Sequence, residues 1–392
     1  MNWLSLFCII ASVFGCAYAL VAAWAARWFV RPAAAITPTT WPDISILKPL
    51  SGLEPQLHEN IESFVKQDYP GRLQVIFGVQ DPYDSVIAVV KSLMRKYPEA
   101  DLRLVVSRAT HGANRKVSNL INMVPEIRHP LIVLADSDVL VGPDYLRTLA
   151  AAVAEPGVGA VTCLYLGLEI GGFWSRMAAM AVQDHFLPGV TVGLALGLAR
   201  PCVGQTIALT RDTLAEIGGF ESVANHLADD YALGEAVRQA GFRVVVSRML
   251  VATVFPEKSF RELALHELRW ARTVFLVSPA GYVGSVITHA LPLALIGAAL
   301  RAFDGWGLAA VLAAFASRLF LKFRLAREFG LPNPNYALTF ARDILSFAVY
   351  LGSFWLNRVS WRGRNFIVKR DGTIVATAER RTDSAKYGKA IR

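Results

Sequence analysis

The strongest constraint on the fold is an alternation of short apolar runs and amphipathic segments between Asp43 and Ser259. Short runs rich in Val and Ile predict buried strands, and the segments between them have helical spacing. The predicted strands are 44–50, 73–80, 102–106, 131–135, 159–165 and 244–247, and the predicted helices are 57–67, 86–97, 117–123 and 232–239. Alternation of this kind predicts an α/β domain with a mostly parallel sheet covered by helices.

Two carboxylates stand at the end of the strand at 131–135, in Asp136-Ser137-Asp138. Residues i and i+2 of a strand project to the same side, and the carboxyl edge of an α/β sheet is where ligands bind. Neighbouring carboxylates with oxygen ligands suit Mg²⁺ or Mn²⁺. The alternative is an Asp-rich turn without a ligand, because Asp is a common turn residue.

Apolar segments flank the α/β region at both ends of the chain. Residues 3–30 are apolar over a length that predicts a membrane helix, and Arg27 and Arg31 at its end place the following domain in the cytoplasm. The composition, 54% hydrophobic and 18% charged, agrees with a chain partly in lipid. Residues 31–42 read as a Pro-rich linker.

Basic segments interleaved with aromatics are lacking, so nucleic acid is not an expected partner.

After Pro279 the sequence contains three candidate membrane segments, 282–300, 306–323 and 340–357. The basic residues between the last two should be cytoplasmic, so a spanning third segment would leave the basic tail outside, against the charge rule. The third segment therefore either spans or lies in the interface. The apolar run 186–199 is too short to span, and is either a buried core helix or a helix at the membrane surface beside the active site.

Further polar residues occur where the predicted elements begin and end. Asp81 follows the second strand and can accept hydrogen bonds from a nucleotide base or ribose, or start an Asx turn. Asn114-Arg115-Lys116 precedes a helix, where the cations can hold phosphate or be a solvated cluster. Asp229-Asp230 opens another helix, as caps or with one of them as a general base.

The last candidate motif is His266-Glu267-Leu268-Arg269-Trp270, on a helix just before the C-terminal apolar segments. Arg beside an aromatic ring can bind and cover a pyrophosphate. The alternative is anchoring at the membrane interface, where Trp and Arg are frequent.

In this order, the motifs resemble those of GT-A nucleotide-sugar glycosyltransferases of the family-2 type, which run D, DxD, (E/D)D and (Q/R)xxRW. Among these the chain is most similar to the ceramide glucosyltransferase branch, over nearly its whole length. The late Trp361-Arg362 also matches this branch. The runs that start at Asn114, His266 and Ala280 more closely resemble bacterial hopanoid-associated glycosyltransferases. His266 departs from the usual Gln or Arg, which puts that residue's contact with acceptor or diphosphate in doubt and argues against a processive polysaccharide synthase.

The resemblance implies an inverting transfer from a UDP-sugar to a lipid hydroxyl, in particular of N-acetylglucosamine from UDP-GlcNAc to bacteriohopanetetrol. On the donor side, the resemblance implies that Asp81 and Lys116 hold UDP, that Arg269 clamps the diphosphate, that Trp270 walls the site and that His266 belongs to the donor site. It implies that Asp136 and Asp138 position the nucleotide sugar through Mg²⁺ or Mn²⁺, with Asp138 as the direct ligand. It also implies that Asp230 is the base, supported by Asp229, and that His185 lies near the acceptor. A lone His such as His185 is otherwise a packed polar residue.

The expected organisation is a membrane helix at 1–30, a linker at 31–42, a GT-A catalytic domain at 43–279, a membrane or interfacial region at 280–357 and a basic tail at 358–392. The resemblance to bacterial proteins implies a place in the inner membrane, with the catalytic domain facing the cytoplasm. Two further hypotheses stay open: a ceramide glucosyltransferase that uses UDP-glucose, and a membrane protein that binds nucleotide sugar or lipid without catalysis.

Overall fold

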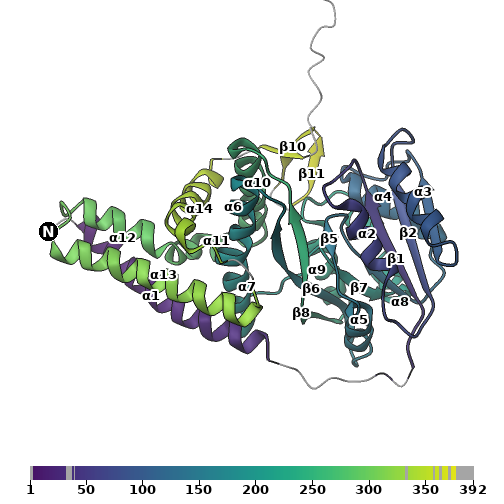
Figure 1. Cartoon of the computed structure of the whole chain (residues 1–392), viewed down its shortest axis with the longest axis horizontal. Helices are drawn as coiled ribbons and strands as arrows, with labels where there is room; N and C mark the ends of the chain where they lie inside the picture. Colours follow the sequence, from purple (N-terminus) through teal and green to yellow (C-terminus); the bar gives the residue numbers. More distant parts are fainter. Residues whose placement is uncertain are drawn as a thin grey trace, which may run out of the picture.

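The structure, a computed structural model, describes residues 3–31, 38, 40–331, 334–355, 358–361, 364–369 and 372–376. It consists of an α/β domain and a bundle of helices that extends away from it (Figure 1). Most of the predicted linker, at 32–37 and 39, lies outside the described residues, as do Arg362 and everything after 376.

The α/β domain is built on one mixed sheet, whose strands in the described part of the chain run in the order β3-β2-β1-β4-β7-β6-β8-β5. Its strands are β1 (Ile44–Leu50), β2 (Leu73–Val79), β3 (Asp101–Val106), β4 (Leu131–Leu134), β5 (Val139–Leu140), β6 (Val158–Glu169), β7 (Ile207–Thr210) and β8 (Arg243–Phe255). β1 is parallel to β2 and β4, and β2 to β3, while β7 is antiparallel to both neighbours. The carboxyl ends of β1, β2 and β4 therefore share one edge.

Helices cover both faces of this sheet, because its strands are apolar on both sides. On β1, Ile44 and Ile46 enter one buried cluster and Leu47 enters the other, and all three are fully buried. The covering helices are α2 (Leu57–Val65), α3 (Val86–Lys96), α4 (Arg115–Met123), α5 (Tyr145–Val153), α8 (Arg211–Glu216) and α9 (Asp229–Gln239). The predicted helix–strand alternation is thus present, with β8 much longer than the expected 244–247.

The extended bundle consists of α1 (Trp3–Phe29), α12 (Ala290–Ala299) and α13 (Gly305–Phe329), which lie together at the left of Figure 1. Among the described helices, α1 is long and apolar enough to cross a membrane. The pair 279–288 and 290–299, bent by 64°, meets the same criterion if it forms one span. α14 (Thr339–Ser353) has 15 residues, fewer than the ~20 that a span needs. Its length favours the interfacial alternative for the segment 340–357.

Four elements lie between the sheet and the bundle: α6 (Phe173–Ala181), the π-helical segment η2 (Val182–Phe186), α7 (Leu187–Ala195) and α10 (Phe260–Val277). α7 packs against α1, with Leu187 and Thr191 buried. Leu196 and Leu198, which follow α7, are exposed. The run 186–199 thus forms a packed helix, as in the first alternative, and continues into an exposed apolar segment.

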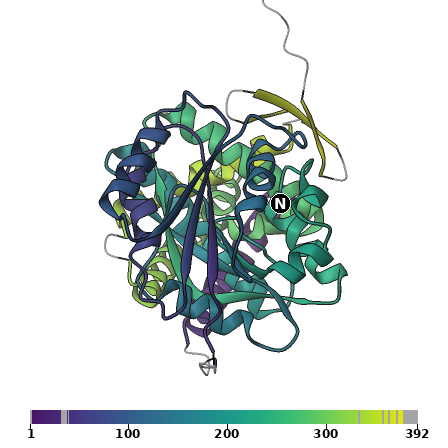
Figure 2. The same cartoon turned by 90° about the vertical axis from the view of Figure 1, so that its right-hand side faces the viewer.

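The C-terminal part forms a small antiparallel sheet of β9 (Arg358–Trp361), β10 (Arg364–Val368) and β11 (Ile374–Ala376), which stands at the upper right of Figure 2. It contacts the segment before α9: Ile374 N donates to Asn225 O at 2.8 Å, and Leu227 N donates to Gly372 O at 3.0 Å. The region predicted as a basic tail therefore begins as folded structure.

Candidate active site

A cavity of about 900 Å³ lies at the carboxyl edge of the sheet. Its walls come from the ends of β1, β2, β4, β6 and β8, from the segments 198–205 and 227–231, and from one face of α10. Of the predicted site residues, it brings together Asp81, Lys116, Asp136, Asp138, Asp230, His266, Arg269 and Trp270. His185 is not among the described residues that line the cavity.

Asp136 and Asp138 lie directly after β4, in the tight turn that leads to β5. Lys116 Nζ is 2.7 Å from Asp136 Oδ1, and buried Lys48 donates a hydrogen bond to the Asp136 carbonyl. The carbonyl of Asp138 accepts from Val254 N at 3.1 Å, which ties the turn to β8. Both carboxylates face the cavity from a fixed backbone.

The surroundings of Asp138 disfavour its negative charge. Burial, followed by the nearby carboxylates of Asp136 and Glu54, raises the pKa of Asp138 to about 7, although Lys48 opposes this. A divalent cation would offset this repulsion, so the carboxylate pair fits Mg²⁺ or Mn²⁺. The described residues contain no cluster of three or more acidic, His or Cys side chains suited to a metal. Further ligands would have to be water and substrate oxygens, as Mg²⁺ often has.

Lys116 connects this turn to the start of α9. Its Nζ lies 3.6 Å from Asp229 Oδ2 in addition to its contact with Asp136. Burial alone would lower the pKa of Lys116, but these carboxylates outweigh burial and raise it. The lysine is therefore held as a cation inside the cavity.

Asp230 is fixed by two backbone groups. Its Oδ2 accepts from Gly204 N at 2.8 Å, and its Oδ1 accepts from Tyr231 N at 2.8 Å. Burial and then the Asp229 carboxylate raise the pKa of Asp230 to about 6, against the effect of Lys116. A carboxylate whose pKa lies near neutrality is suited to taking up a proton.

Asn114 organises the neighbouring helix starts. As the N-cap of α4, its Oδ1 accepts from Val117 N at 3.2 Å. Its amide group donates to Asp229 Oδ1 at 3.2 Å and to His226 O at 2.9 Å. The sequence Asn114-Arg115-Lys116 thus combines a cap with a cavity cation instead of forming a solvated cluster.

Asp81 starts an Asx turn, one of the two alternatives predicted for it, and also lies in the cavity lining. Its Oδ1 accepts from Tyr83 N at 3.0 Å, which is the Asx-turn geometry, and the residue also lines the cavity. Gln80 beside it accepts a hydrogen bond from Arg115 Nε at 3.1 Å. This end of the cavity therefore presents polar groups from β2 and α4.

α10 places His266, Arg269 and Trp270 on the same face of one helix. The helix starts at Ser259, whose side chain accepts from Glu262 N. His266 Nδ1 lies 2.5 Å from Glu257 Oε1, and the imidazole meets the Trp270 ring edge-on at a centroid distance of 4.4 Å. These three residues of the motif thus form part of the cavity wall.

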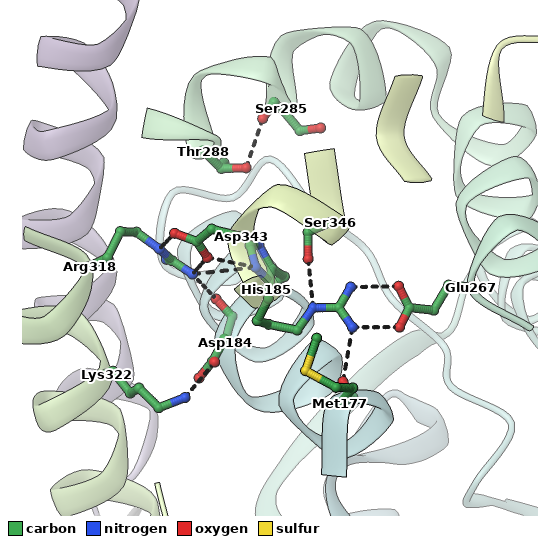
Figure 3. Close-up of polar contacts among 11 residues, drawn as sticks. Met177, Asp184, His185, Glu267, Ser285, Thr288, Arg318, Lys322, Asp343 and Ser346 are labelled. Atoms are coloured by element: carbon green, nitrogen blue, oxygen red, sulfur yellow. Dashed lines mark hydrogen bonds and ion pairs between the residues drawn. The ribbon is translucent and has the colours of Figure 1, made fainter. Parts of the chain in front are cut away.

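His185 lies on η2, next to Phe186, which lines the cavity, but its ring contacts residues of α13 and α14. Its Nε2 is 3.2 Å from Asp343 Oδ1, and Asp343 also forms two 2.8 Å hydrogen bonds with Arg318 (Figure 3). The Asp184 carboxylate pairs with Lys322 at 2.6 Å. The structure thus separates His185 from the cavity lining and joins it to a buried charge cluster.

The sequence analysis missed several residues near the cavity, among them Lys48, Tyr165 and Glu257. Lys48 interrupts the apolar run of β1, and a charged residue inside a strand could have been recognised in the sequence as a candidate site residue. Burial lowers the pKa of Lys48 to about 7. Glu257 follows β8, whose predicted end at 247 hid its position at a strand end. Tyr165 had no signal beyond its place in a strand.

The chain is similar in sequence to known proteins. The family model described as "Glycosyl transferase family 21" matches residues 7–374. Ceramide glucosyltransferase 1 of Caenorhabditis elegans is 26% identical over 209 residues, covering 53% of this chain and 44% of the relative. An N-acetylglucosaminyltransferase of Bradyrhizobium diazoefficiens is 26% identical over 244 residues, covering 60% and 49%. These matches span less than half of either relative.

A similar solved structure is a mannosyltransferase from Pyrobaculum calidifontis in complex with GDP-Man and Mn²⁺. The TM-score is 0.54 at 20% identity, and the alignment covers 90% of this chain and 99% of that one. The likeness confirms the predicted GT-A-like mixed α/β fold.

Proposed function

Because the chain belongs to glycosyl transferase family 21, we propose that it is a membrane-bound, inverting glycosyltransferase that moves a sugar from a UDP-sugar to a lipid hydroxyl. The specific reaction that we propose is transfer of N-acetylglucosamine from UDP-GlcNAc to bacteriohopanetetrol. The similarity to a bacterial N-acetylglucosaminyltransferase supports the choice of sugar.

The observation that carries the proposal is the composition of the cavity. One part is lined by charged groups suited to a nucleotide diphosphate, including Lys116, Arg115 and Arg269. Another part is lined by Phe186, Val274 and Val277, which offer apolar surface. A single cavity with both surfaces suits a reaction between a charged, water-soluble donor and an apolar acceptor.

On the donor side, Asp81 and Lys116 hold the UDP moiety, Arg269 binds the diphosphate and Trp270 closes the wall beside it. Asp136 and Asp138 would hold the divalent cation, with Asp138 as the direct ligand, since Asp136 already pairs with Lys116. When bound, the metal supplies Lewis-acid stabilisation of the charge on the departing diphosphate.

Asp230 acts as the general base, with Asp229 supporting it. It removes the proton from the acceptor hydroxyl as that oxygen bonds to the anomeric carbon. The bond from this carbon to the diphosphate oxygen breaks with its electron pair, and UDP leaves. The attack comes from the face opposite the leaving group, so the anomeric configuration inverts.

The lipid acceptor reaches the site from the bilayer in which α1 is anchored. We propose the expected boundaries at 1–30, 43–279 and 280–357 for the anchor, the catalytic domain and the membrane-associated region. The catalytic domain faces the cytoplasm of a bacterial cell, where UDP-sugars are available. His185, which contacts Asp343 and is not among the described residues that line the cavity, is proposed to act near the acceptor.

A ceramide glucosyltransferase reaction, from UDP-glucose to ceramide, is the second candidate, because several relatives carry that name. Purified enzyme in vesicles is incubated with labelled UDP-GlcNAc or UDP-glucose and with bacteriohopanetetrol or ceramide. We expect label in bacteriohopanetetrol from UDP-GlcNAc. If only ceramide is labelled, the ceramide glucosyltransferase reaction replaces the proposed one. If no lipid is labelled in any combination, both proposed reactions are rejected.

A further inference from the structure

The face of α10 that lines the cavity changes from polar to apolar along its length. Its lining residues recur at helical spacing and are His266, Arg269, Trp270, Thr273, Val274 and Val277. From the first to the last of these the helix rises roughly 16 Å. Beyond Val277 the chain passes through Ser278 into the bent pair 279–299 on the membrane side. An amphiphile that lies along this face, with its apolar part at the membrane end, has its head group beside His266.

At that polar end, Glu257 and His266 form a pair. Glu257 is 7% exposed, and its Oε1 lies 2.5 Å from His266 Nδ1, while none of the described residues hydrogen-bonds to its buried Oε2. The imidazole is more open, with 25% of the side chain exposed. Both residues line the cavity, and the imidazole is the more exposed of the two.

The pairing fixes the orientation of the imidazole. An ionised carboxylate only accepts hydrogen bonds, so Nδ1 carries the hydrogen toward Glu257. In a neutral imidazole this leaves Nε2 as an acceptor. Stacking on Phe255, at a centroid distance of 5.9 Å, and the edge-on contact with Trp270 hold the ring in this position.

We propose that Glu257 and His266 form a hydroxyl-binding subsite for the head group of the lipid acceptor, in which His266 Nε2 accepts a hydrogen bond from a hydroxyl beside the reacting one and Glu257 is the positioning residue. This inference rests on the proposed function. A carboxylate–imidazole pair offers no electrostatic attraction to a diphosphate anion, whereas it can accept a hydrogen bond from a neutral hydroxyl. Hydroxyls belong both to the acceptor and to the donor sugar, and the position at the head of the apolar wall selects the acceptor.

Two amide substitutions of His266 separate the roles of its nitrogens. In His266→Gln the amide extends toward the position of Nε2, whereas in His266→Asn it stops near that of Nδ1. We measure initial rates of transfer from UDP-GlcNAc to bacteriohopanetetrol, and from UDP-glucose to ceramide, varying acceptor and donor in turn. Loss of the hydrogen bond in His266→Asn should raise the acceptor KM about tenfold. His266→Gln should raise it less, and the donor KM should change little in both.

Glu257→Gln tests the positioning role, and Glu262→Gln is its matched control. Glu262 lies on the first turn of the same helix, is exposed and is outside the cavity lining, and Gln can preserve its capping interactions. Glu257→Gln should also raise the acceptor KM about tenfold, and Glu262→Gln should leave it unchanged. Calorimetric binding of UDP to each purified variant establishes that the donor site is folded.

The possible results divide clearly. An acceptor KM at the wild-type value in both Glu257→Gln and His266→Asn overturns the subsite. A rise in the donor KM in place of the acceptor KM assigns the pair to the donor sugar and also overturns it. Absence of transfer by the wild-type enzyme itself, with both pairs of substrates, instead rejects the proposed function and the subsite with it.

Discussion

Arg342 on α14 and Glu267 on α10 form a bidentate ion pair in the interior of the protein. The two hydrogen bonds are 2.7 and 2.6 Å long, and Arg342 is fully buried. The guanidinium also donates to Met177 O on α6 at 2.9 Å and to Ser346 Oγ at 3.0 Å (Figure 3). Because Glu267 is adjacent to His266, this pair ties the helix that carries the cavity wall to the C-terminal region.

Removing one partner of this pair should destabilise the protein strongly. Arg342→Met leaves the Glu267 carboxylate buried without its cation, and such losses amount to about 3–5 kcal/mol. Replacing both residues, in Arg342→Met/Glu267→Met, should recover part of this, because no lone charge remains. Denaturant unfolding of the detergent-solubilised protein measures both effects. Arg72→Met, which removes the exposed pair with Asp43, is the control. Equal stability of Arg342→Met and Arg72→Met would contradict this view.

Asp230→Asn should abolish transfer while donor binding survives. The substitution keeps the size of the side chain but removes its ability to take a proton, so kcat should fall about 10²–10⁴-fold. Radiolabelled transfer gives kcat, and calorimetry gives the affinity for UDP-sugar. Asp212→Asn is the control, since Asp212 also lies in the first turn of a helix, α8, outside this cavity. Normal turnover of Asp230→Asn would assign the base to another residue.

The rate should fall with pH around the pKa of Asp230. The base must be ionised to accept a proton, and burial raises its pKa to about 6. Activity is therefore present above this pH and is lost as the pH falls through it, by about tenfold per unit at saturating acceptor. An exposed aspartate would keep its activity to a pH near its usual pKa of about 4. The profile of kcat between about pH 4.5 and 8 measures this, with UDP binding at each pH as the control. A flat profile would argue against Asp230.

The sequence predicts the parts of this site that depend on residues close together in the chain, and it does not predict contacts between distant segments. The strand-end positions of Asp81 and Asp136 follow from the alternation of strands and helices, because parallel strands end at one edge. Asp230 is likewise found from its motif. Its environment, including the hydrogen bond from Gly204, depends on a loop packed 26 residues away in sequence.

Contacts between distant segments were out of reach. His185 contacts Arg318 and Asp343, which lie 133 and 158 positions further along the sequence. No short-range sequence pattern signals such a pairing. The π-helical turn that aims His185 at them is equally invisible to helical periodicity. Glu257 was hidden by the underestimated length of β8. Long-range packing, and not a lack of recognisable motifs, therefore limits how much of this site can be predicted from the sequence.

Chelation should stop transfer, and Mn²⁺ or Mg²⁺ should restore it. The carboxylates of Asp136 and Asp138 provide a donor set for a hard divalent cation. In Asp138→Asn the loss of one negative oxygen ligand should weaken metal binding by about tenfold or more. Titration of Mn²⁺ followed by electron paramagnetic resonance measures this without turnover. Asp144→Asn, an exposed residue at the start of α5 and outside the cavity lining, is the control. Full activity in EDTA would remove the metal from the mechanism.

His185→Ala distinguishes a role in transfer from a purely structural one. Arg318 already neutralises Asp343 through two hydrogen bonds, so loss of the imidazole leaves this ion pair in place. We therefore expect an unfolding midpoint close to wild type, together with at least about a tenfold loss of transfer. Arg318→Met is the matched comparison: it leaves Asp343 buried without its guanidinium, so the midpoint itself should fall. Wild-type rates in His185→Ala would show that the ring only packs against the cluster. A loss confined to transfer would connect the membrane-side charges to the reacting lipid, since η2 carries both His185 and the cavity residue Phe186.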